Sequence, residues 1–456
     1  MHNANVMAHF LLAAPSSGSG KTTLTLGLLR ALANRGLKVQ PFKCGPDYID
    51  TRHHSTAAGM PSINLDLFMA SAQHVSETYH RYASQADVAV TEGVMGLFDG
   101  SDKMQGSSAA LAESLNTPVI LVVNAKAMAY SVAPLLYGFK HFYKGINLIG
   151  VIFNYVNTAS HYRFLQEACV DVGVEALGYL PANPAFSIPS RHLGLHISAE
   201  TDYEAIIQAI AEAIPRTIDL DRLLAITRSG LVSVPCDPHP LPVTTSSLRI
   251  AIARDEAFTF TYEQNIDVLA RLGTVTFFSP LKDISMPETD FLYLPGGYPE
   301  LYADRLSQNQ SMRDSIRNYC LAGGLTYAEC GGLMYLGQAI QNNSGDWFSM
   351  TNVLNLTTSM LPAKLTLGYR RITWEGITLS GHEFHYSVLH DPDRSESIAS
   401  VTNAKGLPVA TTVYRTKNTV ASYLHLYWAE KPEFIHTLLD CVDPVTTSSK
   451  RAQHHD

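Results

Sequence analysis

The chain has 456 residues, enough for two or three domains, and its 46% hydrophobic and 16% charged residues are ordinary for a globular enzyme. A net charge of −8 without a sustained basic run argues against a nucleic-acid partner. The six cysteines form no CxxC pair, which argues against a disulfide framework and a zinc cluster and favours a reducing cytoplasm. No apolar run is long enough to predict a transmembrane helix, so we expect a cytoplasmic protein without a membrane partner.

Residues 1–214 predict a doubly wound α/β domain. Short apolar segments alternate with longer helical ones, the apolar segments being "HFLLAA", "LKVQPFK", "ADVAVTE", "PVILVVN" and "NLIGVIFN". Near-continuous apolar strands separated by helices are typical of a parallel sheet that is covered on both faces. The first domain is therefore expected to be built on such a sheet.

The stretch "AAPSSGSGKTT", residues 13–23, follows the first predicted strand and opens a helix. In such a loop the backbone N–H groups surround phosphate oxygens, the lysine neutralises them and the threonine hydroxyl reaches magnesium. Pro15 stands where the plainest Walker A pattern has a glycine. We expect this loop to bind the phosphate groups of a nucleotide through Gly18, Ser19, Gly20, Lys21, Thr22 and Thr23.

Two acidic residues follow later strands: Asp47 in "KCGPDYID" and Glu92 in "VAVTEGVMGLFDG". Ligands of open α/β sheets bind beyond the carboxyl ends of the strands, so we expect both carboxylates to reach one metal-nucleotide site together with Thr22. For either residue alone, a solvated loop carboxylate is the alternative interpretation.

Residues 215–247 break the pattern and contain several prolines within a short stretch, which predicts an extended linker. A second α/β series occupies residues 248–441, and residues 442–456 form a polar tail.

The stretch "GGLTYAECGGLMYLG", residues 323–337, predicts a buried strand, a sharp glycine turn and an apolar helix. The turn places Cys330 at a helix N-terminus, where unpaired backbone N–H groups favour the nucleophilic thiolate. A buried cysteine that acts as a small hydrophobe is the alternative.

The first half resembles a known family through four motifs in matching order, "APSSGSGKTT", "VQPFKCGPDYIDTRHH", "EGVMGLFDG" and "IPSRHLGL". Together they resemble the synthetase domain of cobyrinic acid a,c-diamide synthases, a family related to dethiobiotin synthetase and cobyric acid synthase. The resemblance implies Mg²⁺ and ATP at Lys21, Thr22, Asp47 and Glu92.

The same resemblance implies further contacts with substrates. Tyr48 and Asp99, in the "PDYID" and "LFDG" loops, would contact a tetrapyrrole. Asn154, after the strand "GVIF", is similar to an asparagine that reads adenine in related folds, although an asparagine at a strand end is often only a turn residue.

The second half resembles class I glutamine amidotransferase domains of the cobyric acid synthase type, with a flavodoxin-like fold, through "LPGGYPE", "AECGGLMYL" and "YLHLYW". Amide hydrolysis by a thiolate needs a base and an oxyanion hole, and His425 is the expected base for the nucleophile Cys330. The oxyanion hole is expected from the backbone N–H groups of Gly296, Gly297 and Gly331.

Two features of this half depart from the simplest pattern. Tyr427 stands where class I amidotransferases commonly carry a glutamate that orients the histidine, so we expect slow or coupling-dependent glutamine hydrolysis. His382 and His385 have the spacing of a metal pair but no evident third ligand, so we expect them to face the substrate or the other domain.

The resemblance implies a carbon–nitrogen ligase of cobalamin biosynthesis that amidates the a and c carboxylates of cobyrinic acid, with ATP and L-glutamine as co-substrates. An acyl phosphate would react with ammonia that reaches it along an internal path. Hydrogenobyrinic acid and nickel-sirohydrochlorin are alternative substrates, and cobyric acid synthase is a related alternative enzyme. A P-loop switch ATPase is a further alternative, but Ser16 stands where such proteins carry a signature lysine. The sequence leaves the oligomeric state open, including a homodimer.

Overall fold

The computed structural model describes residues 6–188, 202–231 and 248–440. The chain divides into two compact units, residues 1–238 and 239–456. Most of the "IPSRHLGL" motif, the prolines expected in the linker and the polar tail lie outside the described residues. None of the described helices is both long and apolar enough to cross a membrane.

The first unit is built on an eight-stranded sheet with the order β3-β2-β4-β1-β5-β6-β7, and β8 pairs with β1. All pairings among β1 to β7 are parallel, whereas β8 is antiparallel to the start of β1. Its strands are β1 (Val6–Ala13), β2 (Val39–Cys44), β3 (Ile63–Leu65), β4 (Val88–Glu92), β5 (Val119–Asn124), β6 (Leu148–Asn154), β7 (Glu175–Leu180) and β8 (Arg228–Gly230).

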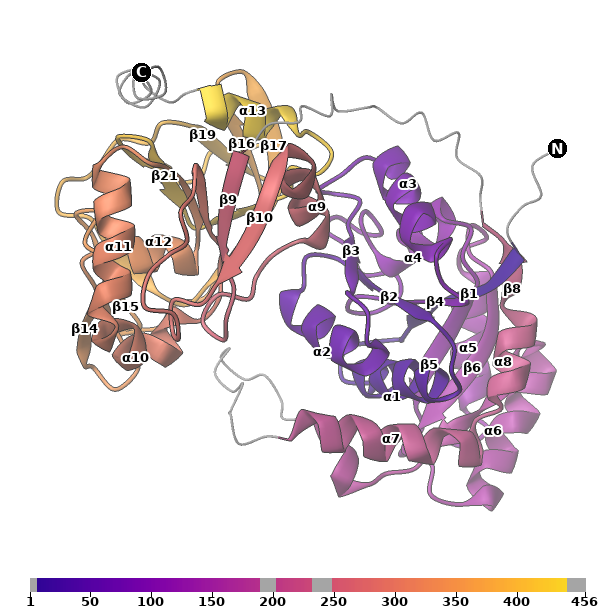
Figure 1. Ribbon diagram of the computed structural model, residues 1–456. Helices are drawn as coiled ribbons and strands as arrows, with labels where there is room; N and C mark the ends of the chain where they lie inside the picture. Colours follow the sequence, from indigo (N-terminus) through magenta and orange to yellow (C-terminus); the bar gives the residue numbers. More distant parts are fainter. Residues whose placement is uncertain (1–5, 189–201, 232–247, 441–456) are drawn as a thin grey trace. The chain divides into compact units, whose positions relative to one another are not determined.

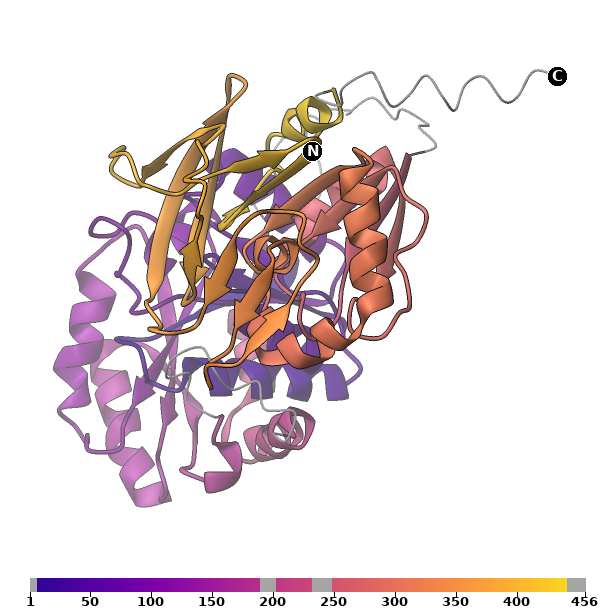
Figure 2. The same cartoon turned by 90° about the vertical axis from the view of Figure 1, so that its left-hand side faces the viewer.

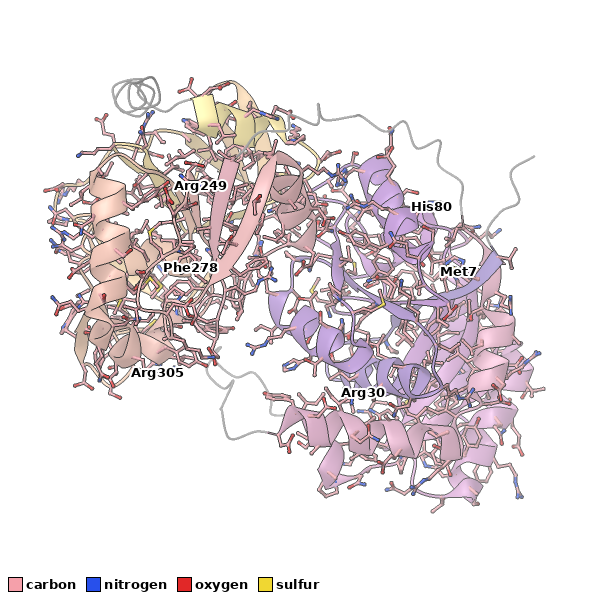
Figure 3. All side chains as sticks on the ribbon, in the orientation of Figure 1. Met7, Arg30, His80, Arg249, Phe278 and Arg305 are labelled. Carbon is pink, nitrogen blue, oxygen red and sulfur yellow. The ribbon has the colours of Figure 1, made fainter. Side chains whose placement is uncertain are left out.

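Helices cover both faces of this sheet, with α1 and α7 on one side and α3 and α4 on the other (Figure 1). The helices are α1 (Lys21–Asn34), α2 (Tyr48–Ala58), α3 (Ala72–Ala83), α4 (Ser108–Ser114), α5 (Val132–His141), α6 (Ala159–Val172), η1 (Pro184–Phe186), α7 (Tyr203–Thr217) and α8 (Leu220–Ile226). Arg30 of α1, labelled in Figure 3, forms an ion pair with Glu204 of α7, and the two helices share an apolar cluster with the sheet. The doubly wound parallel architecture is as predicted.

The first unit extends beyond residue 214, where the sequence-based domain ended. Helix α7 includes Pro215 in its last turn and ends two residues later, at Thr217. Ile218 and Leu223 are buried in the core of the first unit, and β8 then adds to the sheet. Residues 215–231 therefore belong to the domain core, because their apolar side chains continue to face it.

The second unit has a six-stranded sheet of order β10-β9-β11-β12-β21-β20 and two four-stranded sheets, β14-β13-β15-β18 and β19-β16-β17-β22. In the large sheet every pairing is parallel except that of β20 with β21. Strands of the large sheet are β9 (Leu248–Ala253), β10 (Gly273–Phe278), β11 (Phe291–Leu294), β12 (Leu325–Glu329), β20 (Tyr414–Thr416) and β21 (Thr419–Ser422). Strands of the small sheets are β13 (Ala339–Gln341), β14 (Trp347–Ser349), β15 (Thr357–Ser359), β16 (Thr366–Trp374), β17 (Ile377–His385), β18 (Val388–His390), β19 (Ser400–Asn403) and β22 (Leu424–Leu426).

The large sheet of this unit is buried on both faces. Along β9 the side chains alternate, so that Ala251 and Ala253 belong to one apolar cluster and Ile250 and Ile252 to another. The helices are α9 (Glu263–Leu272), η2 (Pro299–Tyr302), α10 (Ala303–Gln308), α11 (Gln310–Leu321), α12 (Gly331–Leu336) and α13 (Glu433–Asp440). Figure 2 shows the long antiparallel strands β16 and β17 side by side, in light orange, with β22 continuing their sheet.

Candidate active sites

The phosphate loop between β1 and α1 has the backbone that its glycines predict. Gly18 and Gly20 adopt φ values of 77° and 85°, in the left-handed region that glycine tolerates best. A Cβ atom on Gly20 would lie 1.8 Å from Nδ2 of Asn154. The same Nδ2 donates a hydrogen bond to the carbonyl of Ser19 at 3.1 Å. Asn154 thus holds the loop in shape from the end of β6.

Lys21 and Thr22, at the start of α1, are oriented toward the loop that follows β4. Nζ of Lys21 donates to the carbonyl of Met95 at 2.8 Å, and Oγ1 of Thr22 donates to Oε1 of Glu92 at 2.7 Å. Burial lowers the pKa of Lys21, and the charge of Glu92 opposes that shift. The predicted residues Lys21, Thr22 and Glu92 therefore meet at one place.

A buried cluster of charges surrounds Glu92. Nζ of Lys43 lies 2.8 Å from Oδ2 of Asp50 and 3.1 Å from Oε1 of Glu92, and Nε2 of His54 lies 2.6 Å from Oε2 of Glu92. Burial alone would raise the pKa of Glu92, but Lys43 and His54 lower it to about 2. Glu92 is therefore a carboxylate throughout the physiological range.

Lys43, Asp50 and His54 were missed in the sequence analysis. Burial opposes the charged form of Lys43, yet Asp50, Glu92 and, less strongly, Asp47 hold its pKa above the ordinary value. The available signals were a lysine inside an otherwise buried strand, and the four-residue spacing of Asp50 and His54, which places both on one face of α2. Neither signal identifies a partner without the fold.

The remaining residues predicted here occupy the two neighbouring loops. Asp47 is the N-cap of α2, where its Oδ1 accepts from the backbone N–H groups of Ile49 and Asp50 at 2.8 and 2.9 Å. Tyr48 is buried in the first turn of α2. Asp99 is exposed, and its Oδ2 accepts from the N–H of Gly96 at 3.0 Å, which closes the loop after β4. Asp47 thus starts the helix that supplies Asp50 and His54.

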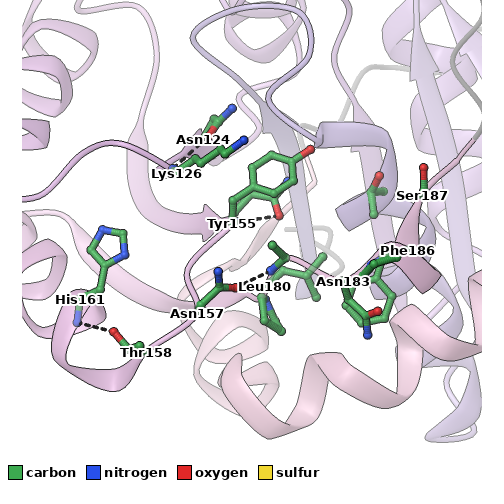
Figure 4. Close-up of a pocket in the computed structure, with 15 residues that line it drawn as sticks. Asn124, Lys126, Tyr155, Asn157, Thr158, His161, Leu180, Asn183, Phe186 and Ser187 are labelled. Atoms are coloured by element: carbon green, nitrogen blue, oxygen red, sulfur yellow. Dashed lines mark hydrogen bonds between the residues drawn. The ribbon is translucent and has the colours of Figure 1, made fainter.

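A cavity of about 690 Å³ adjoins the phosphate loop (Figure 4). Thr23 and Asn154 lie on its phosphate-loop side, and Asn124 and Lys126 line it after β5. His161 of α6 contributes a ring to the wall. The cavity lies beyond the carboxyl ends of β5, β6 and β7, where ligands of open α/β sheets bind, and its volume suits a nucleoside.

In the second unit, Cys330 occupies a strained turn between β12 and α12. Its φ of 44° and ψ of −101° are unusual for a residue with a side chain. A Cβ atom on Gly331 would lie 2.9 Å from the backbone nitrogen of Gly297, and one on Gly332 would lie 2.1 Å from the carbonyl oxygen of Leu294. The two glycines therefore allow α12 to approach the end of β11 closely.

Gly296 marks the point where the predicted catalytic pair converges. A Cβ atom built on Gly296 would lie 2.3 Å from Cε1 of His425 and 3.4 Å from Cβ of Cys330. Gly296 follows β11, Cys330 follows β12 and His425 lies on β22, so three strands bring these residues together. The Cys330 thiol lies 3.8 Å from the carbonyl oxygen of Phe384.

The expectation that the helix terminus favours the Cys330 thiolate was wrong for this state. Burial raises the pKa of the thiol, and the charge of Glu300 raises it further. Helix α12 has only six residues, and the N–H of Gly331 opposes the shift too weakly to offset burial. Burial also lowers the pKa of His425, so the pair consists of a neutral thiol and a neutral imidazole. A neutral imidazole can accept the thiol proton.

His382 and His385 have separate partners. His382 is the cross-strand neighbour of His425, and the two rings stack at 4.8 Å between centroids. His385 stacks on Tyr423 at 3.7 Å. Across the described ranges there is no group of three residues suited to hold a metal ion. His382 is therefore part of the packing around His425.

Glu329 was a further omission of the sequence analysis. Its Oε1 accepts from the N–H of Leu426 at 3.0 Å, and its carboxylate also accepts from the hydroxyl groups of Tyr293 and Tyr327. Burial raises its pKa to about 8. Because Leu426 directly follows His425, Glu329 fixes the strand that carries the histidine. Tyr427 packs edge-on against Tyr262 instead of supplying a carboxylate.

Comparisons with known proteins match both units of the chain. Residues 10–195 match the family model of the CobQ/CobB/MinD/ParA nucleotide binding domain, and residues 249–433 match that of the CobB/CobQ-like glutamine amidotransferase domain. A cobyrinate a,c-diamide synthase of Listeria monocytogenes is 40% identical over 440 residues, which cover 92% of this chain and 96% of the relative. One from Salmonella typhimurium is 40% identical over 93% of this chain and 96% of its own.

A relative whose name gives another substrate and a solved structure also match the chain. A hydrogenobyrinate a,c-diamide synthase of Brucella abortus is 39% identical over 92% of this chain and 98% of its own. The crystal structure of a glutamine amidotransferase covers 42% of this chain and 98% of that chain, with 18% identity and a TM-score of 0.31, which is too low to carry an argument.

Proposed function

The chain belongs to the cobyrinate a,c-diamide synthase family and is a glutamine-dependent ligase, and we propose that it amidates the a and c carboxylates of cobyrinic acid. One observation carries this proposal: a phosphate loop beside a buried Glu92 and a strained Cys330 beside His425 occur in the same chain. We further propose that the first unit binds ATP and the tetrapyrrole and that the second unit releases ammonia from glutamine.

ATP is proposed to bind with its phosphates on the loop Gly18–Thr22 and its adenosine in the adjoining cavity, where Asn154 is the candidate for adenine recognition. Thr22 and Glu92 present hydroxyl and carboxylate oxygens, which Mg²⁺ prefers, and phosphate oxygens and water would complete its coordination. When bound, Mg²⁺ would neutralise charge on the phosphates. Lys21 adds a positive charge beside them.

The tetrapyrrole carboxylate is proposed to approach the γ-phosphate from the loops that carry Tyr48 and Asp99. A carboxylate oxygen attacks the γ-phosphorus, and the bond to the β,γ-bridging oxygen breaks, so that ADP leaves and an acyl phosphate forms. Ammonia then attacks the acyl carbon, and phosphate leaves. Because water would hydrolyse the acyl phosphate, we propose a sheltered path for ammonia from the second unit.

In the second unit the Cys330 thiol is proposed to pass its proton to His425 as sulfur attacks the side-chain amide carbon of glutamine. The N–H groups of Gly296, Gly297 and Gly331 would stabilise the oxyanion. Collapse of the tetrahedral intermediate breaks the C–N bond, and His425 returns the proton to the leaving ammonia. Water then hydrolyses the glutamyl thioester to glutamate and regenerates the thiol.

Hydrogenobyrinic acid is a second candidate substrate, because a relative with that substrate in its name is 39% identical, close to the 40% of the cobyrinate enzymes. We further propose a cytoplasmic enzyme, because its cysteines form no CxxC pair, without a nucleic-acid or membrane partner, because the sequence has neither a sustained basic run nor a long apolar run.

Mass spectrometry of the products tests the proposal. Purified protein is incubated with Mg-ATP, glutamine and, in parallel, cobyrinic acid, hydrogenobyrinic acid or nickel-sirohydrochlorin. We expect a diamide from cobyrinic acid. A diamide from only one of the other two acids would correct the substrate, and the absence of any amide despite ATP hydrolysis would contradict the reaction.

A further inference from the structure

His425 is the proposed base of the amide site, and its ring has to face Cys330 to accept the thiol proton. The torsion that turns an imidazole about its Cβ–Cγ bond is broad, so neighbouring side chains decide where the ring points. Tyr427 stands where class I amidotransferases commonly carry the orienting glutamate. The orientation of His425 therefore has to come from side chains other than a carboxylate at position 427.

His382 of β17 covers one face of the His425 ring. The two residues are cross-strand partners, and their rings stack with centroids 4.8 Å apart and an angle of 17° between their planes. The strands approach closely at this point, because a Cβ atom on Gly381 would lie 2.1 Å from the carbonyl oxygen of His425. Both histidines are buried, with exposed fractions of 4% and 0%. Rotation of the His425 ring would therefore collide with His382.

His382 is itself held in place by Tyr262. The hydroxyl oxygen of Tyr262 forms a hydrogen bond of 3.0 Å with Nδ1 of His382. Tyr427 packs edge-on against the same Tyr262 ring, with 5.5 Å between centroids. A series of contacts thus runs from position 427 through Tyr262 and His382 back to His425.

The other edge of the His425 ring is confined as well. A Cβ atom on Gly296 would lie 2.3 Å from Cε1 and 3.0 Å from Nδ1 of His425, so only a glycine fits there. The carbonyl oxygen of Phe384, two residues after His382 on β17, lies 3.8 Å from the Cys330 thiol. Strand β17 therefore contacts both the proposed nucleophile and the proposed base.

We propose that His382, held by Tyr262, is the positioning residue for His425 and takes the place of the orienting glutamate. The inference rests on the amide site of the proposed function and adds the group that orients its base. Burial lowers the pKa of His382 to about 3, so its ring is neutral and puts no second positive charge beside His425 when His425 takes the thiol proton. The feature that acts on His425 is thus a flat ring rather than a charge.

The test compares H382L, which removes the flat ring, with H382F, which keeps it. Release of glutamate from glutamine is measured for the full-length proteins with Mg-ATP and cobyrinic acid. We expect H382L to lower kcat by about 10-fold, as for the loss of one stacked ring pair, and to leave KM within about 2-fold, because His382 acts on the base. H382F should stay within about 3-fold of the unaltered kcat. H390L, at an exposed histidine of β18, is the matched control and should change neither constant.

An unchanged kcat in H382L, or an equal loss in H382L and H382F, would overturn the proposal, since a merely structural role does not depend on the flat ring. Tryptophan fluorescence during urea unfolding checks that the variants fold, because all three tryptophans lie in the second unit. If H382L does not fold, Y262F decides. It removes the hydroxyl that holds His382, and we expect kcat to fall by about 3-fold at constant KM. An unchanged kcat in Y262F would then contradict the proposal.

The same assay separates this inference from the proposed function. Absence of glutamate release from the unaltered protein would contradict the amide site itself and the role of His382 with it. Glutamate release that is insensitive to His382 would contradict the positioning role alone. Amidation with ammonium chloride should remain unchanged in every variant, because it does not use His425, and its loss in H382F would contradict an effect confined to the base.

Discussion

At the scale of the residue, the most unusual feature of the first unit is the buried set Lys43, Asp50, His54 and Glu92. Nζ of Lys43 contacts the carboxylates of both Asp50 and Glu92, and Nε2 of His54 contacts Glu92. Such groups are costly to bury singly but stable as a paired set. The cluster therefore fixes Glu92 in its charged form beside Thr22, before any nucleotide arrives.

Replacing Lys43 should lower the free energy of unfolding, because its charge pairs with both buried carboxylates. K43M leaves two buried carboxylates without their cation, and we expect the free energy of unfolding to fall by about 3–5 kcal/mol. K38M, at an exposed lysine, should change it by less than about 0.5 kcal/mol. Urea unfolding of both variants is followed by circular dichroism. Tryptophan fluorescence is unsuitable for the first unit, because the three tryptophans all lie in the second unit. Equal stabilities of the two variants would contradict the role of Lys43.

At the scale of the element, the turn between β12 and α12 positions Cys330 in the proposed amide site. Its cysteine and glycines could be predicted from the sequence, because a strand, a sharp turn and a helix have distinct residue patterns. The state of the thiol could not be predicted, because it depends on Glu300, Glu329 and Glu383, which come from three different elements. The stacking of His382 on His425 likewise depends on the register of β17 with β22.

Close packing at Gly332 provides a test of this element. G332A would place a Cβ atom 2.1 Å from the backbone oxygen of Leu294, which displaces α12 and its cysteine. We expect at least a 10-fold loss of glutamine-dependent synthesis while ammonia-dependent synthesis persists. G138A is the control, since that helical glycine has open space around it and alanine is the better helix former. Unchanged glutamine-dependent activity in G332A would contradict the close approach.

At the scale of the whole molecule, the sequence motifs predicted two α/β units and their order, and family membership follows from matches over more than nine-tenths of the chain. The limit of the first unit was harder to place, because Pro215 resembles a boundary although Ile218 and Leu223 continue the core. Phosphate-loop and cysteine motifs are contiguous in sequence and therefore recognisable. The charge cluster depends on contacts between separate segments, which only the fold supplies.

The central claim is that one chain couples two separate chemistries, and the nitrogen source of the product tests it most directly. Diamide formation is measured with amide-¹⁵N glutamine and, separately, with ammonium chloride, for the unaltered protein, C330S and K21A. We predict that C330S loses glutamine-dependent synthesis and keeps ammonia-dependent synthesis, and that K21A loses both, because phosphate activation serves either nitrogen source. Retention of ¹⁵N incorporation by C330S, or loss of both reactions in it, would contradict the account.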